Sequence, residues 1–250
     1  MPRFFIQLSF KGTNYHGWQS QPNANTIQAE IEKALATLTN ELTETTGAGR
    51  TDAGVHARNY IAHFDTDHNL AKDPADFAYK LNAILPGDIS VHKIIPVIPD
   101  AHARYSAISR TYEYTISRVK DPFNPEFSWY YPLPLEFSAM NEASAVLKNF
   151  TDFTSFSKLH SDVKTNNCKV FEASWTIEDS KMVFTIKADR FLRNMVRAIV
   201  GTMIDIGKGR LKVFDLQNVI EGKNRSLAGF SVPAQGLMLC EIEYPEEVLK

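Results

Sequence analysis

The chain has 250 residues, a mass of 28.2 kDa and a formal net charge of −2, from 27 basic and 29 acidic side chains. Hydrophobic residues make up 44% and charged residues 22%, which is typical of a globular protein and excludes an intrinsically disordered one. Two cysteines are too few for a disulfide framework, and the sequence contains neither a signal segment nor an apolar run of membrane-spanning length. We therefore expect a soluble, cytoplasmic protein in which any binding of a polyanion depends on local surface charge.

The first hundred residues alternate between strand and helix patterns. Apolar residues at every second position over residues 4–10 predict a strand. A helical spacing of apolar residues begins at Ile27, after the N-cap candidates Asn25 and Thr26. Three more elements follow in the order strand, helix, strand, over residues 60–64, 73–85 and 89–98. This order is typical of an α+β or an α/β protein.

From residue 104 the pattern of strands and helices starts again. Four prolines between residues 120 and 135 indicate an ordered surface excursion or a boundary. We expect two similar α+β halves, residues 1–104 and residues 105–250, which share one continuous sheet. The predicted strands of the second half are 111–117, 169–177, 182–188 and 237–244, and its predicted helices are 138–148, 190–206 and 213–221.

The predicted helix over residues 190–206 has two different faces. Residues 187–212 contain seven basic and two acidic side chains, a net charge of +5 in a slightly acidic protein. Such a basic stripe is either a solvated helix face or a wall that faces phosphate groups, which Arg190 and Arg193 would then contact. One arc of the helix carries Arg190, Arg193, Asn194, Arg197, Gly201 and Asp205, and the opposite side carries Leu192, Met195, Val196, Ile199 and Met203.

Residues 47–54, Gly-Ala-Gly-Arg-Thr-Asp-Ala-Gly, form the most distinctive loop of the sequence. The loop is not a dinucleotide-binding fingerprint, because Asp52 stands where the third glycine belongs and because we expect a helix, not a strand, before it. It is not a P-loop either, because no Gly-Lys-Ser/Thr follows. What remains is a tight turn that presents Arg50 and Asp52 between small residues, either as a structural turn or as a site that a ligand approaches closely.

Residues 49–56, Gly-Arg-Thr-Asp-Ala-Gly-Val-His, resemble the signature loop of the tRNA pseudouridine synthase A (TruA) family. The resemblance extends from about residue 4 to residue 244, although Gln235 stands where the family often has an acidic residue. Further segments that match the family's motifs in order and spacing are residues 15–21, 85–89, 102–107, 110–114, 152–156, 191–201 and 236–239.

The resemblance implies an isomerase that converts uridine to pseudouridine at positions 38, 39 and 40 of the tRNA anticodon stem-loop. In this reaction the N1–C1′ bond breaks, the uracil turns, and C5 becomes bonded to C1′. No group donor or redox change is involved, so the resemblance implies no cofactor. The seven histidines and two cysteines show no metal-ligand spacing, so we expect no metal site.

The resemblance also implies a role for individual residues. Asp52 is the catalytic carboxylate, which either acts at C1′ or removes a proton from C2′. Arg197 would pair with Asp52 and keep it ionised, and Arg50 would enter the space that the flipped nucleotide leaves. Tyr112 would stack on the uracil and Leu237 would line the pocket beneath it. From the residues alone, Arg197 is also consistent with a surface arginine, and Tyr112 and Leu237 with core positions.

We expect the pseudouridine synthase fold, a mixed and mostly antiparallel sheet with helices packed on it and a basic catalytic cleft. The resemblance implies a homodimer, in which two protomers pool modest basic surfaces around one tRNA. Two other functions stay open. An RNA-binding module with this fold would bind tRNA without catalysis, and a glycosidase would need a second carboxylate about 5–9.5 Å from the first.

Overall fold

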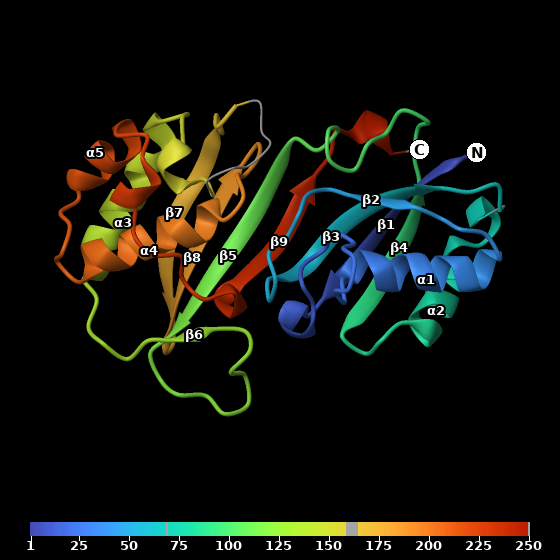
Figure 1. The fold of residues 1–250 in the computed structure, drawn as a ribbon, viewed down its shortest axis with the longest axis horizontal. Helices are drawn as coiled ribbons and strands as arrows, with labels where there is room; N and C mark the ends of the chain where they lie inside the picture. Colours follow the sequence, from blue (N-terminus) through green and yellow to red (C-terminus); the bar gives the residue numbers. More distant parts are fainter. Residues whose placement is uncertain (69, 159–164, 250) are drawn as a thin grey trace. The chain divides into compact units, whose positions relative to one another are not determined.

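The computed structural model describes residues 1–68, 70–158 and 165–249, and its strands form a mixed, mostly antiparallel sheet of nine strands with five α-helices among these residues (Figure 1). The predicted α+β class and sheet type are therefore confirmed. The chain divides into two compact units, Met1–Ile108 with Leu239–Lys250, and Ser109–Met238. None of the helices in the described ranges has both the length and the apolar character that crossing a bilayer requires.

The first unit contains the central strand β1 (Arg3–Phe10), which pairs antiparallel with β3 (His56–Asp65) on one side and with β4 (Ile89–Pro96) on the other. The short strand β2 (Thr45–Gly47) also pairs with β3, and the last strand, β9 (Leu237–Glu243), follows β3 in the strand order. Both faces of β1 are largely buried.

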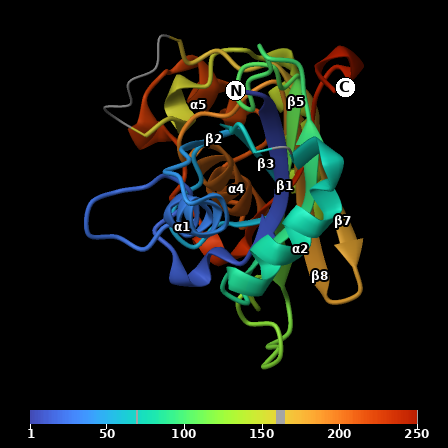
Figure 2. The same cartoon turned by 90° about the vertical axis from the view of Figure 1, so that its right-hand side faces the viewer.

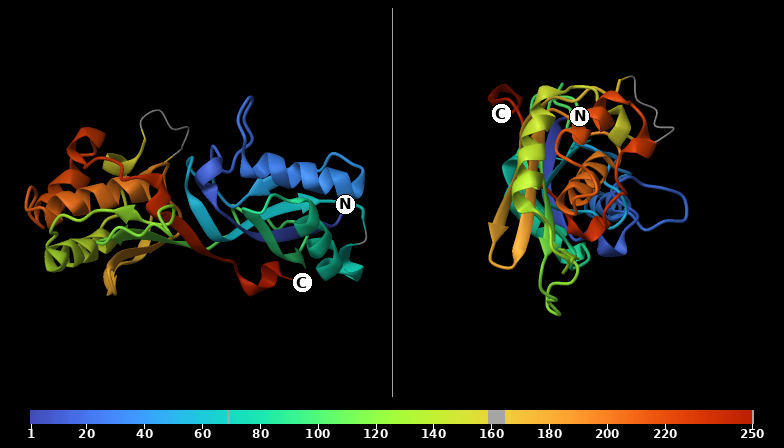
Figure 3. Two further views of the ribbon diagram at one scale, coloured as in Figure 1. Left: turned by 90° about the horizontal axis from the view of Figure 1, so that it is seen from below. Right: turned by 90° about the vertical axis from the view of Figure 1, so that its left-hand side faces the viewer.

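Two helices belong to the first unit, and each begins at a side-chain cap. Helix α1 (Ile27–Thr39) starts after Thr26, whose hydroxyl accepts a hydrogen bond from the backbone N of Ala29 at 3.4 Å. Helix α2 (Pro74–Ile84) starts after Asp73, whose carboxylate accepts a hydrogen bond from the backbone N of Asp76 at 2.9 Å. Pro74 fits the first helical position, because a backbone N–H there would have no partner within the helix. Helix α1 lies along one face of the strands, and α2 packs beside β4 (Figures 2 and 3).

The second unit contains β5 (Ser109–Ser117), β8 (Lys181–Ala188) and β7 (Val170–Glu178), which pair antiparallel in that order. The short strand β6 (Trp129–Tyr130) pairs parallel to β5. Helices α3 (Phe137–Val146) and α4 (Met195–Gly207) lie side by side (Figure 3), and α5 (Asp215–Glu221) follows them.

The proline-rich segment over residues 118–136 forms a long loop within the second unit (Figure 1). It carries β6, and the side-chain Nε2 of Gln235 donates to the carbonyl oxygens of Pro125 and Ser128, each at 3.2 Å. These contacts make the segment an ordered excursion of one unit, which is one of the two possibilities that its prolines predicted.

Helix α4 differs from the prediction in its start and in its surroundings. It begins at Met195 and not at residue 190, because Asn194 has a left-handed backbone with a φ of 68°, which a continuous helix cannot contain. Arg190 and Arg193 therefore lie in the connection before the helix, and the prediction that they share its face is wrong. Of the 13 helix residues, all except Arg197 and Asp205 are buried, so α4 is a core helix and not a basic wall.

Candidate active site

The residues predicted for catalysis are divided between the two units. Asp52 and Arg50 belong to the first unit, in the loop between β2 and β3, where Asp52 is half-buried and Arg50 is exposed. The second unit contains the others, which are Tyr112, Arg190, Arg193, Arg197 and Leu237.

The loop around Asp52 joins two strands. The three residues of β2 precede it, so the expectation of a helix directly before the loop is wrong. The exclusion of a dinucleotide fingerprint nevertheless stands, because Asp52 replaces the third glycine and because β3, a strand, follows where that motif needs a helix.

The side chains of Tyr60 and Trp18 pack against the loop. Tyr60 lies in the middle of β3 and is fully buried, and its hydroxyl donates to the carbonyl oxygen of Gly49 and accepts from the backbone N of the same residue at 3.4 Å. The Trp18 ring stacks on the Tyr60 ring with the centroids 4.2 Å apart. A Cβ on Gly47 would lie 2.1 Å from the Tyr60 hydroxyl oxygen, so only glycine fits where the loop crosses this pair.

A second segment, residues 12–17, fixes the loop from the side. The backbone N of Gly54 donates to the carbonyl oxygen of Tyr15 at 3.3 Å. Gly17 has a φ of 90°, and a Cβ there would lie 2.2 Å from the carbonyl oxygen of Thr51. The backbone is thus closely packed before Asp52, at Thr51, and hydrogen-bonded at Gly54, and the carbonyl oxygen of Asp52 itself accepts from the backbone N of Val55 at 3.2 Å.

The segment that supports the loop is itself anchored. The Tyr15 hydroxyl donates to Oδ1 of Asp88 at 2.6 Å, and burial together with this carboxylate raises the pKa of Tyr15. The backbone N of Gly12 donates to Nδ1 of the buried His56 at 3.0 Å. Asp88 and His56 therefore act on the loop indirectly, through the segment that contacts it.

In the second unit, Arg197 lies in the first turn of α4. Its side-chain Nε donates to the carbonyl oxygen of Val232 at 2.8 Å, and the backbone N of Val232 donates back to the carbonyl oxygen of Arg197 at 3.3 Å. The guanidinium is therefore fixed by the segment before β9.

Two glycines allow that segment to cross α4. A Cβ on Gly201 would lie 1.7 Å from the carbonyl oxygen of Phe230, and a Cβ on Gly229 would lie 2.6 Å from the carbonyl carbon of Gly201. The backbone N of Gly229 also donates to the hydroxyl of Thr202 at 2.8 Å. The helix arc, for which the sequence left a solvated face and a phosphate-facing wall open, is covered at Gly201 by the backbone at Phe230.

Tyr112 and Leu237 belong to the strands β5 and β9. Tyr112 is half-buried on β5, and the Phe191 ring meets its ring edge-on with the centroids 5.1 Å apart. Tyr114, two residues on and thus on the same face of β5, donates from its hydroxyl to the carbonyl oxygen of Pro233 at 2.9 Å. Leu237 begins β9 and is only 6% exposed. Tyr114 and Arg197 bond to the adjacent carbonyls of residues 233 and 232, which brings the first turn of α4 close to this face of β5.

Arg190 and Arg193 have different environments. Arg190 is half-buried and lies two residues after the end of β8, whereas Arg193 is exposed and its carbonyl oxygen accepts from the backbone N of Lys158 at 3.1 Å. Of the two side chains, that of Arg193 is the more exposed.

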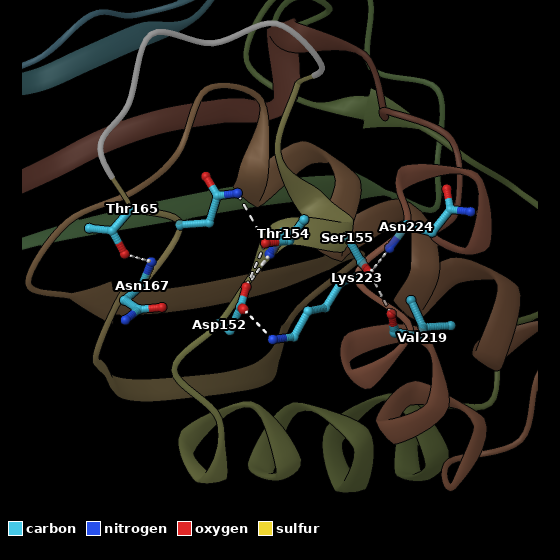
Figure 4. Close-up of polar contacts among 9 residues, drawn as sticks. Asp152, Thr154, Ser155, Thr165, Asn167, Val219, Lys223 and Asn224 are labelled. Carbon is cyan, nitrogen blue, oxygen red and sulfur yellow. Dashed lines mark hydrogen bonds and ion pairs between the residues drawn. The ribbon is translucent and has the colours of Figure 1, made fainter.

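The motif over residues 152–156 forms a polar junction with the end of α5 (Figure 4). The Asp152 carboxylate accepts from the Thr154 hydroxyl at 2.6 Å and pairs with Nζ of Lys223 at 2.9 Å, and these contacts lower the pKa of Asp152. The Ser155 hydroxyl donates to the carbonyl oxygen of Val219. Among the described residues, these contacts join the segment to α5 and its C-terminal end and hold the helix in place.

Several of these supporting residues carried no functional signal in the sequence. Tyr60 fits the alternating pattern of a buried strand, and Gly229 is an isolated glycine. Gly201 ends the recognised segment 191–201, but its pattern does not reveal that another segment crosses it. Their importance arises from contacts with residues far along the chain. Trp18 was part of a recognised motif, but only the structure relates it to the Asp52 loop.

Comparisons with known proteins identify the family. A family model described as tRNA pseudouridine synthase matches residues 7–106 and 150–245, and the interval between the two ranges includes Tyr112. The chain is 56% identical over 248 residues to tRNA pseudouridine synthase A of Parabacteroides distasonis, an alignment that covers 99% of this chain and 98% of the relative. It is 54% identical to the protein of the same name from Bacteroides fragilis, with 99% and 98% covered, and 40% identical to that from Caldicellulosiruptor bescii, with 98% and 100% covered. The chain therefore belongs to the tRNA pseudouridine synthase family.

Proposed function

We propose that this protein converts uridines 38, 39 and 40 in the anticodon stem-loop of tRNA to pseudouridine, with Asp52 as its catalytic carboxylate. The family and the names of full-length relatives support the reaction and the tRNA substrate. The observation that carries the role of Asp52 is the position of its backbone, which Gly17 approaches closely at Thr51 and which hydrogen bonds hold at Asp52 and Gly54. A catalytic side chain needs such a fixed backbone, because small displacements of a reacting group lower the reaction rate strongly.

The reaction is an isomerisation, so every atom of the substrate is kept. The N1–C1′ bond breaks, the detached uracil turns, and the C5–C1′ bond forms; the proton that leaves C5 is balanced by one gained at N1. Positive charge develops at C1′, which a carboxylate stabilises by attack or by its field. Alternatively Asp52 removes the C2′ proton, and a rate decrease with 2′-deuterated uridine would identify that route.

The other site residues complete the proposal. Arg197 pairs with the Asp52 carboxylate, and Arg50 fills the space of the flipped nucleotide, since flipping costs a few kcal/mol of stacking. Tyr112 stacks on the uracil and Leu237 excludes water beneath it. Arg190 and Arg193 contact phosphates, and this contribution falls with rising salt.

The deciding experiment maps pseudouridine in unmodified tRNA after incubation with wild type, Asp52→Asn and Asp52→Ala. Asp67→Asn is the control, because Asp67 is an exposed carboxylate whose side chain is 74% accessible. We expect product at positions 38–40 from wild type and from the control, and none from either Asp52 variant. Product from Asp52→Asn at the wild-type rate would contradict the proposal, and tRNA binding by wild type without any product would identify a binding module.

The proposal includes a homodimer. A chain with a net charge of −2 has little basic surface for binding tRNA phosphates. Two protomers together present twice as much basic surface to one tRNA. Sedimentation at micromolar concentration should give about twice the 28.2 kDa mass of the chain. Full activity of a species that sediments as a monomer would contradict the dimer.

A further inference from the structure

Residues 101–107 form a tight turn that follows β4, and its hydrogen bonds converge on His102. Nδ1 of His102 accepts from the backbone N of Arg104 at 3.1 Å and from that of Tyr105 at 3.3 Å. The Ser106 hydroxyl accepts from the backbone N of His102, and the backbone N of Ser106 donates to the carbonyl oxygen of His102, both at 2.9 Å. The turn therefore has a defined shape, which fixes where the side chains of Arg104 and Tyr105 begin.

A column of aromatic rings runs from the core of the first unit to this turn. His63, buried in β3, meets His102 edge-on with the ring centroids 4.7 Å apart, and His102 in turn lies 4.4 Å from the ring of Tyr105. At the outer end, Tyr105 is 75% exposed, and the Arg104 guanidinium lies 5.4 Å from its ring centroid. The exposed ring of Tyr105 is thus packed on the ring of His102 and lies next to the Arg104 cation.

We propose that His102, Arg104 and Tyr105, here called the Tyr105 platform, bind an unstacked base of the tRNA substrate. The inference rests on the proposed function for the identity of the nucleic acid. Tyrosine offers its ring to any base, because every base has a π-face, and a neighbouring arginine adds a contact to the base or to its phosphate. Such a platform selects an exposed nucleotide of a loop or end and not a paired one.

The charges around the platform suit this ligand. Burial lowers the pKa of both histidines, that of His63 to about 4, so neither imidazole carries a charge at neutral pH. Arg104 then supplies positive charge at the surface, and the imidazoles support the Tyr105 ring. Because the whole chain has a net charge of −2, stacking provides affinity that bulk electrostatics does not.

The platform lies away from Asp52 within the first unit. The first residue of the loop, Gly47, is opposite Ala62, but the carbonyl oxygen of Asp52 accepts from the backbone N of Val55 at 3.2 Å, which places Asp52 at the His56 end of β3. His63 stands seven residues after His56 on β3, a separation of about 23 Å at about 3.3 Å per residue. The platform therefore contacts a nucleotide other than the reacting uridine. Its loss should weaken tRNA binding and leave the rate of the bound complex unchanged.

The test compares Tyr105→Ala with Tyr79→Ala, measuring the Kd for full-length unmodified tRNA and the single-turnover rate at saturating tRNA. Tyr79 is a matched control, because it is 74% exposed in the same unit, on α2. Loss of one base–aromatic stack should raise the Kd about tenfold in Tyr105→Ala, with an unchanged rate, while Tyr79→Ala and Tyr105→Phe bind as wild type.

Three outcomes would overturn the platform. The first is an unchanged Kd in Tyr105→Ala. The second is wild-type binding by Tyr105→Leu, which would indicate apolar contact without stacking. The third is a fall in the sedimenting mass of Tyr105→Ala, which would indicate that Tyr105 lies in a protein interface. The proposed function fails separately: if wild type forms no pseudouridine while the tRNA affinities follow the expected pattern, the platform stands without it.

Discussion

Tyr60 shows how a single buried hydroxyl can serve the site. It satisfies both backbone groups of Gly49, three residues before Asp52, and its ring is held in place by Trp18. Replacing the hydroxyl with hydrogen would leave the half-buried carbonyl and N–H of Gly49 without this partner, which costs about 1–3 kcal/mol. We therefore regard Tyr60 as a positioning residue for the Asp52 loop.

Tyr60→Phe should lower the single-turnover rate at saturating tRNA about tenfold, since it frees the loop that carries Asp52, and should leave the tRNA affinity unchanged. The matched control is Tyr244→Phe, which also removes a hydroxyl that donates to a carbonyl, that of Ala103 at 2.5 Å. If Tyr60 were only structural, both variants would lose stability and neither would lose rate. A wild-type rate in Tyr60→Phe would exclude the positioning role.

Helix α4 shows how an element acquires its surroundings from the rest of the chain. By pattern, its arc with Arg197, Gly201 and Asp205 is the polar side of an amphipathic helix. In the structure, the backbone at Phe230 crosses the helix at Gly201, and the helix is buried on nearly all sides. The crossing fixes Arg197 through Val232, so close backbone approach is the reason for glycine at this position.

Gly201→Ala tests the crossing. In an ordinary helix this change stabilises by about 0.5–1 kcal/mol, because alanine is the better helix former. Here the added Cβ would overlap the carbonyl oxygen of Phe230, so we expect a loss of about 2 kcal/mol in the free energy of unfolding, measured by urea denaturation. The control is Gly87→Ala, where a Cβ meets no atom within 4 Å. Stabilisation by Gly201→Ala would show that the crossing is loose.

At the scale of the whole molecule, stability depends on pH through buried histidine. The pKa of His63 is lowered to about 4, mainly because burial disfavours the charged imidazole and also because Arg3 is near. Between about pH 6.5 and pH 4 the unfolded chain binds a proton at this residue and the folded chain does not. Stability from His63 is therefore complete above pH 6.5 and is lost as the pH falls toward 4.

We expect the first unit to lose about 2 kcal/mol of stability through His63 between pH 7 and pH 5, measured from hydrogen exchange of the β3 amides. His63→Asn should flatten this part of the profile, because asparagine retains an acceptor for the backbone N of Ala103 and does not titrate. His92→Gln, at an exposed site, is the control and should keep the wild-type slope. An unchanged slope in His63→Asn would exclude His63 as its source.

Much of this protein is determined locally, and the sequence reveals that part. Alternating apolar residues and capping side chains identified β1, α1 and α2 close to their observed bounds, because such elements depend on neighbouring residues. The loop with Arg50 and Asp52 was evident from its residue types. The fold class and the family followed from these patterns and motifs together.

Only the tertiary structure decided which distant segments meet. In the folded chain the Tyr60 hydroxyl bonds to Gly49, and the backbone at Phe230 crosses α4 at Gly201. The last residues of the chain, from Leu239 on, belong to the first unit. Helix α4 starts after Asn194, whose left-handed backbone no periodicity reveals. The physical reason is that side-chain spacing records which face of an element is apolar, whereas the segment that covers this face is chosen by packing of the whole chain.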